Sequence, residues 1–164
     1  MWQRSRVRRD VEVRETGDRG LGLFVRRAFE PGELIFRRTH TPVGSRADVQ
    51  LLSPAQREHV CQVDDDAFAL VSPPGCYANH ACDPSAIRHG VAMLALRALD
   101  AGDEVTLDYR LNALDGDSWP CRCGSPSCTG VVEGSFFALP PERQAELLPH
   151  APAFIRRRHR QRQR

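Results

Sequence analysis

Lysine is absent from this chain of 164 residues, because all 23 of its basic residues are arginine. Aromatic residues are also scarce, with two tyrosines, two tryptophans and seven phenylalanines. No apolar run approaches the ~20 residues that a membrane-spanning helix requires, and the basic start of the chain lacks the apolar core of a signal peptide. We therefore expect a cytoplasmic protein with no membrane partner, and the sequence leaves export as an effector open.

The net charge of +2 conceals an uneven distribution of charge along the chain. Four arginines lie within residues 1–10 and six lie within residues 156–164. Over residues 10–155, thirteen arginines oppose all 21 acidic residues, which leaves a net charge of −8. Such an acidic body attracts basic polypeptides and repels nucleic acid. Nucleic acid could bind only through the basic tails, 1–10 and 156–164, which are more simply explained as solvated segments.

The pattern of apolar residues predicts short strands and few helices. Strands are expected at residues 11–14, 21–25, 34–36, 67–71, 91–99 and 104–109. Ser53, Pro54 and Gln56 have the residue types of a helix start, so a helix is expected from Ser53 to near Cys61. A second helix is expected at residues 140–148, whereas residues 39–50 and the polar stretch 112–120 show no regular pattern. The sequence therefore predicts one mainly β domain with few short helices and a cysteine-rich C-terminal cap.

Three of the six cysteines, Cys121, Cys123 and Cys128, lie within eight residues of one another. Cys121 and Cys123 are too close to pair comfortably as a disulfide. Thiolates at this spacing suit a zinc ion, which is held about 2.3 Å from sulfur, and Gly124 permits the tight turn between them.

A closed tetrahedral zinc site needs a fourth ligand. Spacing alone leaves four candidates for that ligand, namely Cys61, Cys76, Cys82 and His80. Because Cys61 is expected at a helix end, it is better explained as a small buried apolar residue.

Three further motifs precede the cysteine cluster. The loop from Asn79 to Pro84 places an amide, an imidazole and a thiol within four positions and has no helical or strand period. Gly20-Leu21-Gly22-Leu23-Phe24 forms a glycine turn, and Leu107-Asp108-Tyr109 ends an expected strand. Taken singly, these motifs are explained by a polar loop, a hairpin turn and an aromatic residue that packs on the core. In this order, followed by the cysteine cluster, they resemble the SET-domain protein methyltransferases with a post-SET zinc module.

The resemblance covers roughly residues 11–137 and implies a SET-type β-clip fold of short strands with a pseudoknot. It places a SET domain at residues 11–110 and a zinc-binding post-SET segment, packed on that domain, at residues 119–137. It also implies S-adenosylmethionine as cofactor, bound by Gly20, Leu21, Gly22, Asn79 and His80. For the metal, it selects Cys82 as the zinc ligand that joins Cys121, Cys123 and Cys128.

The implied reaction is methyl transfer to the side-chain amine of a lysine, with Tyr109 as the catalytic residue. The amine must be neutral to react, yet the pKa of free lysine is about 10.4. A narrow apolar channel and the adjacent sulfonium charge lower that pKa. A free tyrosine, with a pKa near ~10, is a poor base at neutral pH, so the Tyr109 hydroxyl is better assigned as a fixed dipole that aligns the amine. An enzyme of this kind cannot methylate its own side chains, since it has no lysine.

Departures from the family pattern bear on substrate and product. Cys76-Tyr77-Ala78 replaces the common Arg-Phe-Ile, Ser85 follows Pro84 where Asn is usual, and Leu107 stands where Phe or Tyr is usual. In the family, Tyr at this last position favours monomethylation and Phe admits further transfers, so Leu107 is the expected product-specificity position. Phe136 and Phe137 could line the lysine channel or belong to the core.

Two other functions fit parts of the sequence. The first is a catalytically silent, zinc-stapled interaction module, and the second is a zinc protein that binds nucleic acid through its arginine-rich tails. Neither explains the Asn-His loop and the Leu-Asp-Tyr strand together. The sequence therefore favours a protein-lysine methyltransferase whose partner is a basic, lysine-containing protein segment.

Overall fold

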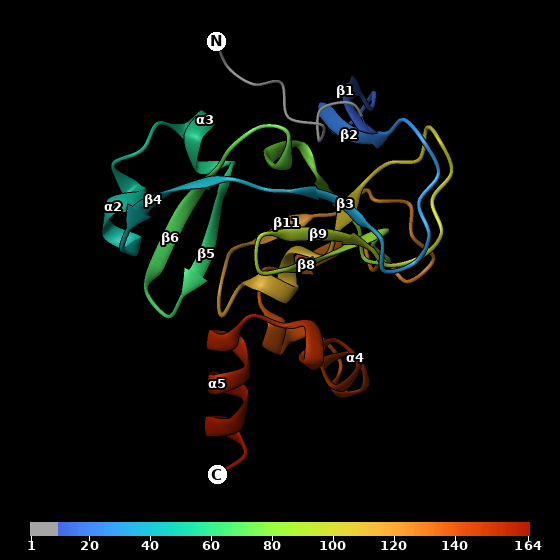
Figure 1. Cartoon of the computed structure of the whole chain (residues 1–164). Coiled ribbons are helices and arrows are strands. Elements are labelled where there is room, and N and C mark those ends of the chain that lie inside the picture. Colours follow the sequence, from blue (N-terminus) through green and yellow to red (C-terminus); the bar gives the residue numbers. More distant parts are fainter. Residues whose placement is uncertain (1–9) are drawn as a thin grey trace. The chain divides into compact units, whose positions relative to one another are not determined.

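Strands of two to five residues and a few short helices make up residues 10–164, the part of the chain that the structure, a computed structural model, describes (Figure 1). This architecture confirms the prediction of a mainly β chain. The contacts divide the chain into two units. The first unit contains the described residues up to Thr39, Pro73–Asp108 and Arg122–Cys128; the second contains His40–Ser72, Tyr109–Cys121 and Thr129–Arg164. Because each unit is assembled from three separate stretches, no linker in the sequence marks the division.

The first unit contains a hairpin, a three-stranded sheet and a short parallel pair. Strand β1 (Val11–Glu15) pairs antiparallel with β2 (Leu21–Val25), in a register that sets Val11 opposite Val25. The sheet has the order β3 (Leu34–Arg37), β9 (Ala92–Ala95), β8 (Ala86–His89). After the turn η1 (Gly75–Tyr77), β7 (Asn79–His80) runs parallel to β10 (Thr106–Leu107).

The alternating residues of these strands supply the core of the first unit. The buried side chains of this core include Leu23, Val25, Phe29, Phe36, Met93 and Val105. Leu23 and Val25 point inward because successive side chains of a strand face opposite sides. The backbone of β2 is hydrogen-bonded to the segment before β10, since Val25 N donates to Asp103 O and Val105 N donates to Leu23 O. The glycine turn and the later strand are thus held together by main-chain bonds.

The second unit contains the sheet β4 (His40–Gly44), β6 (Ala67–Val71), β5 (Val60–Asp64), which is coloured teal to green in Figure 1. Helices α2 (Arg46–Gln50) and α3 (Pro54–Arg57) lie between β4 and β5 in the chain. The rest comprises η2 (Tyr109–Asn112), the antiparallel pair β11 (Ser118–Pro120) and β12 (Val131–Glu133), η3 (Phe136–Ala138), α4 (Pro141–Leu147), η4 (Leu148–His150) and α5 (Ala153–Arg162).

Helix α3 begins as predicted but ends early. Ser53 is its N-cap, Pro54 occupies the first turn, and the Gln56 side chain completes a capping box. The helix ends at Arg57, and the prediction of Cys61 at a helix end is wrong because Cys61 lies in β5. Strand β5 pairs with β6 along its length, and the buried Gln62 side chain donates to the carbonyls of Asp64 and Asp65.

Other elements differ from the predictions in extent. Residues 39–50 contain β4 and α2, and α2 has a Ser45–Asp48 capping box that the sequence also displays. Residues 91–99 contain only the four-residue β9, and β8 was not predicted. The strand expected at 104–109 is regular only at Thr106–Leu107, and the stretch expected as a polar loop, 112–120, ends in β11. The helix expected at 140–148 is confirmed as α4.

The C-terminal basic segment is not a separate tail, because it forms most of α5. Phe154 and Ile155 are buried in this helix. Arg157 pairs with Asp64 and Asp65, and Arg158 Nη2 lies 3.4 Å from Asp65 Oδ1. The arginines of the N-terminal tail, at positions 4, 6, 8 and 9, lie outside the described residues. Within residues 10–164, no helix is long and apolar enough to cross a membrane.

Candidate functional site

The turn between β1 and β2 is fixed by its own polar groups. Thr16 N and Thr16 Oγ1 both donate to Gly20 O, at 2.8 Å and 2.9 Å, and Arg19 N donates to Thr16 Oγ1 at 3.2 Å. Gly22, two residues after the turn, occupies a crowded position. A Cβ atom there would lie 2.5 Å from Thr16 Cγ2 and 2.8 Å from Glu104 Oε1. Only glycine therefore lets the Glu104 carboxylate approach this strand.

Asn79 connects the glycine turn to the later strand. Its Nδ2 donates to Leu21 O at 3.1 Å and to Glu104 Oε1 at 2.9 Å. The other carboxylate oxygen, Glu104 Oε2, accepts from Arg19 Nη2 at 2.7 Å. The glycine turn, the Asn-His pair and the strand that leads to Tyr109 thus meet at one side chain, although 58 and 25 residues separate Asn79 from its two partners.

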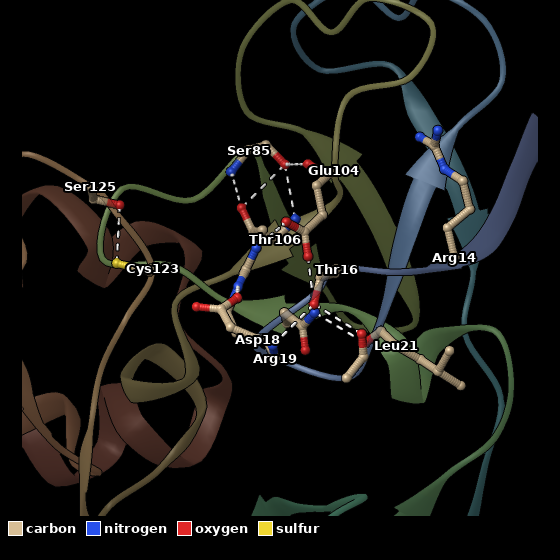
Figure 2. Close-up of polar contacts among 12 residues, drawn as sticks. Arg14, Thr16, Asp18, Arg19, Leu21, Ser85, Glu104, Thr106, Cys123 and Ser125 are labelled. Carbon is tan, nitrogen blue, oxygen red and sulfur yellow. Dashed lines mark hydrogen bonds and ion pairs between the residues drawn. The ribbon is translucent and has the colours of Figure 1, made fainter.

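Ser85 joins the loop after Asn79 to the same strand. Its hydroxyl donates to Glu104 O at 2.7 Å and accepts from Thr106 N at 2.9 Å, while Ser85 N donates to Thr106 Oγ1 at 3.0 Å. Figure 2 shows Ser85, Glu104 and Thr106 joined by these bonds. Ser85 and Thr106 are buried. The serine that departs from the family pattern is therefore a structural connector, and Glu104, Arg19 and Ser85 are the site residues that sequence reasoning missed.

His80 lies between two other groups of the site. Its ring is buried, with Nδ1 3.9 Å from Asp108 Oδ1 and Nε2 3.5 Å from Cys82 Sγ. The parallel pairing of β7 and β10 sets His80 beside Leu107, and Ala81 N donates to Leu107 O at 2.9 Å. The partly buried Leu107 packs against the core of the first unit.

Four cysteine sulfurs lie within 4.8 Å of one another, those of Cys82, Cys121, Cys123 and Cys128. Four sulfurs held tetrahedrally at about 2.3 Å from zinc are roughly 3.8 Å apart, so this donor set fits the ion. Ser125 supports the cluster, because its Oγ lies 3.2 Å from Cys123 Sγ and accepts from Asp83 N (Figure 2 shows the Cys123 contact). Gly124, at a φ of +72°, makes the turn that was predicted.

The cluster contains the thiol of Cys82 and neither Cys61 nor Cys76. Of the four fourth-ligand candidates that spacing left open, the structure thus brings Cys82 to the other three thiols. Cys82 N also donates to Cys123 Sγ at 3.4 Å. Zinc bound here would draw on thiolates from two distant parts of the chain.

Tyr109 belongs to the second unit, where it begins η2. Its side chain is exposed, and its ring centroid lies 6.2 Å from that of Trp119 at an interplanar angle of 47°. Phe136 is fully buried and so belongs to the core. Phe137 stacks on His159 at an angle of 15°, and the Arg162 guanidinium lies 3.8 Å from its ring centroid.

Comparison with known proteins shows which families and proteins this chain is similar to. Residues 20–110 match the family model described as SET domain. The chain is 26% identical over 140 residues to the variant-silencing SET domain-containing protein of Plasmodium falciparum, and 27% identical over 139 residues to the H3 lysine-36 specific histone-lysine N-methyltransferase of Mus musculus. It is 26% identical over 176 residues to the histone-lysine N-methyltransferase ash1 of Drosophila melanogaster.

These matches span very different shares of the proteins compared. They cover 73%, 75% and 98% of this chain but only 6%, 5% and 8% of those three relatives. The fold is similar to the methyltransferase domain of human histone-lysine N-methyltransferase SETMAR, with a TM-score of 0.60, 20% identity and coverage of 76% of this chain and 58% of that chain. The solved structure therefore supports the predicted SET-like fold.

Proposed function

This chain belongs to the SET-domain family, and on that premise we propose that it transfers the methyl group of S-adenosylmethionine to the side-chain amine of a lysine in a protein substrate. One observation carries the proposal. The Asn79 amide bonds both to the glycine turn and to Glu104, so three motifs that are scattered along the sequence form one polar site. A silent interaction module has no need of this convergence.

The first unit offers the groups that would hold the cofactor. Asn79 lies beside the Leu21 carbonyl, and β7, which carries Asn79 and His80, pairs with β10. Gly20, at a φ of +70°, has open space where a side chain would stand, so a ligand can approach the main chain of the turn closely. S-adenosylmethionine, when bound, would supply a methyl group activated by a sulfonium. The contribution of these residues is to fix the donor's position, which dominates the rate of an in-line displacement.

Tyr109 is the residue that we assign to the transfer itself. It follows Asp108 directly in the chain and lies two residues after β10. A tyrosine hydroxyl serves as a fixed dipole that orients the amine lone pair and stabilises the charge of the transferring methyl. Deprotonation of the lysine would rest on the apolar surroundings and the nearby sulfonium, both of which disfavour the ammonium form.

Zinc would be held by the four clustered thiols and have a structural role. A closed site of four thiolates has no open position for substrate, so the metal would supply fold stability and no Lewis-acid chemistry. Its ligands include Cys82, three residues after Asn79, so the metal would restrain the segment that carries the cofactor residues.

The substrate class follows from charge. Residues 10–155 carry a net charge of −8, which favours a basic polypeptide. Two of the relatives carry names of histone methyltransferases, and the mouse protein's name specifies histone H3 lysine 36. We therefore propose a basic, lysine-containing protein segment, with histone tails as the first substrate to test.

The deciding experiment uses labelled S-adenosylmethionine with purified protein and, separately, histones and a cell lysate. Label should appear on lysine, be absent from the enzyme itself, and disappear with Tyr109→Phe. A folded protein that does not bind S-adenosylmethionine would overturn the proposal and favour the silent module. Salt-sensitive binding to DNA without methylation would favour the nucleic-acid reading.

A further inference from the structure

No step of the proposed methyl transfer uses the Glu104 side chain, although its contact with Asn79 joins two motifs of the site. The side chain of Glu104 is 16% exposed and that of Arg19 is 26% exposed, so both charges are largely withdrawn from water. Removing a carboxylate from water is costly unless hydrogen bonds compensate it. Both oxygens of Glu104 are used: Oε2 accepts from Arg19 Nη2 at 2.7 Å and Oε1 accepts from Asn79 Nδ2 at 2.9 Å.

These bonds determine which way the Asn79 amide faces. Its Nδ2 has two hydrogens, and both are directed to acceptors, the Glu104 carboxylate and the Leu21 carbonyl at 3.1 Å. A flipped amide would set its oxygen against two other oxygens, which is repulsive. One orientation is therefore fixed, and the side-chain oxygen Oδ1 accepts no hydrogen bond from residues 10–164.

We propose that Glu104, held by Arg19, is a positioning residue that fixes the Asn79 amide so that its Oδ1 receives the ammonium group of the S-adenosylmethionine amino-acid end. This inference rests on the proposed function. An amide that is oriented before the ligand arrives loses no rotational freedom on binding, and this raises affinity. Glu104 acts through Asn79 and has no contact of its own with the reacting atoms in this scheme.

Gly22 provides independent support for the same role. The space that its missing side chain leaves is filled by the Thr16 methyl group and the Glu104 carboxylate, since a Cβ there would lie 2.5 Å from Thr16 Cγ2 and 2.8 Å from Glu104 Oε1. The glycine thus leaves room for the Glu104 carboxylate. We expect Gly22→Ala to displace the carboxylate and to weaken cofactor binding in the same way as loss of Glu104.

The first test needs no cofactor. In the folded protein without ligand, the Asn79 side-chain amide protons should exchange slowly with solvent and resonate apart from those of exposed amides in a ¹⁵N-labelled sample. Glu104→Ala should abolish this protection, whereas Glu104→Gln, which keeps an acceptor oxygen, should retain part of it. Unchanged protection in Glu104→Ala would overturn the proposal whether or not the protein is a methyltransferase.

The second test measures the dissociation constant of S-adenosylmethionine by calorimetry. Glu104→Ala should weaken binding about tenfold, the effect of losing one hydrogen bond to a charged group, while turnover at saturating cofactor changes little. Glu12→Ala is the matched control, because Glu12 lies on the β1–β2 hairpin that carries Arg19 and pairs with Arg14 and Arg26 but not with Asn79. It should change the constant by less than about twofold.

A double-variant cycle separates positioning from a general structural effect. If Glu104 acts through Asn79, then Glu104→Ala should weaken cofactor binding no further in a protein that already carries Asn79→Ala. Additive losses would overturn the proposal. Absence of cofactor binding by the unaltered protein, together with protected Asn79 amide protons, would instead defeat the proposed function and leave the Glu104–Asn79 arrangement standing.

Discussion

Arg19 and Arg157 each pair with a carboxylate far away in the sequence, in the first and the second unit respectively. The side chains of Arg19 and Glu104 are 26% and 16% exposed, whereas those of Arg157 and Asp64 are 43% and 56% exposed. Glu104 also binds Asn79, whereas Arg157 also binds the neighbouring Asp65, whose backbone N–H donates to Asp64. An exposed pair is screened by water and contributes little. A partly buried pair that also binds a third side chain, as Glu104 binds Asn79, fixes the orientation of that side chain.

The two units also differ in the residues that the proposed reaction assigns to them. The residues assigned to the cofactor, Asn79 and His80 among them, belong to the first unit, and the tyrosine assigned to catalysis belongs to the second. Variants in the two units should therefore alter different measured quantities.

The largest effect is expected at Tyr109. Tyr109→Phe should lower kcat about 100-fold or more, the loss typical of one donor that acts on a transition state, while the dissociation constant of S-adenosylmethionine stays nearly unchanged. Asn79→Ala should instead weaken cofactor binding. Steady-state kinetics beside calorimetry separates the two outcomes. Near-normal turnover of Tyr109→Phe would remove Tyr109 from the mechanism even with the fold intact.

The next largest effect is expected from substitution of a zinc ligand. The protein should contain about one zinc per chain, and Cys82→Ser should lose most of it and unfold at a lower temperature. Cys76→Ser is the matched control, since Cys76 lies outside the cluster and burial raises the pKa of its thiol, which keeps it protonated and a poor ligand. Metal analysis by mass spectrometry decides between them. Retention of zinc by Cys82→Ser, with loss in Cys76→Ser, would reassign the ligand.

Leu107 should set the extent of methylation. It has no hydroxyl and fills less space than an aromatic ring, so it should not restrict the enzyme to a single transfer. We expect dimethyl- or trimethyllysine to accumulate, and Leu107→Tyr to shift the product toward monomethyllysine. Mass spectrometry of a substrate peptide after long incubation measures this. An exclusively monomethylated product from the unaltered protein, at full conversion, would contradict the Leu107 argument.

The two arginine pairs allow a direct comparison of stability. Arg19→Ala leaves the Glu104 carboxylate partly buried without its cation, and should lower the free energy of unfolding by about 1–3 kcal/mol. Arg157→Ala should change it by no more than the error of a urea denaturation curve, because both partners are exposed. Equal losses in the two variants would show that burial does not distinguish these pairs.

The sequence predicted the parts of the site that depend on residue type at fixed spacing. The three clustered cysteines and the glycine turn fall into this class, as does the capping box of α3, whereas Asn79 and His80, expected in a loop, form β7. The end of α3 was wrong because pairing of β5 with β6, a long-range contact, overrode the local helical pattern. Short strands such as β7 and β10 have too few residues to show a period.

Glu104 and Ser85 were missed for a different reason. Glu104 lies two residues before β10 and close after a turn, where an exposed acidic residue is ordinary, and only the fold brings Arg19 and Asn79 to it. Ser85 was noted as a departure from the family pattern, yet its hydroxyl bonds to the main chain on both sides of Val105. Contacts between residues far apart in the sequence cannot be predicted from the local spacing of residue types.

The smallest effect is a change in the titration of Asp64. Its pKa lies below the usual 3.8 mainly because its carboxylate accepts from the Asp65 backbone N–H, and secondly because it binds Arg157. A carboxyl whose pKa is lower in the folded than in the unfolded state adds stability above its unfolded pKa, near ~3.9, and loses it as the pH falls through the folded pKa. Arg157→Ala should therefore raise the pKa of Asp64 only part of the way to its ordinary value, and the small loss of stability that it causes should be complete above pH ~5 and should vanish below the folded pKa. Titration of the Asp64 carboxyl by NMR, in Arg157→Ala and in the unaltered protein, measures the change. A complete return to the ordinary pKa would make Arg157, and not the Asp65 backbone, the main partner of Asp64, and the exposed pair of the second unit would then resemble the partly buried pair of the first.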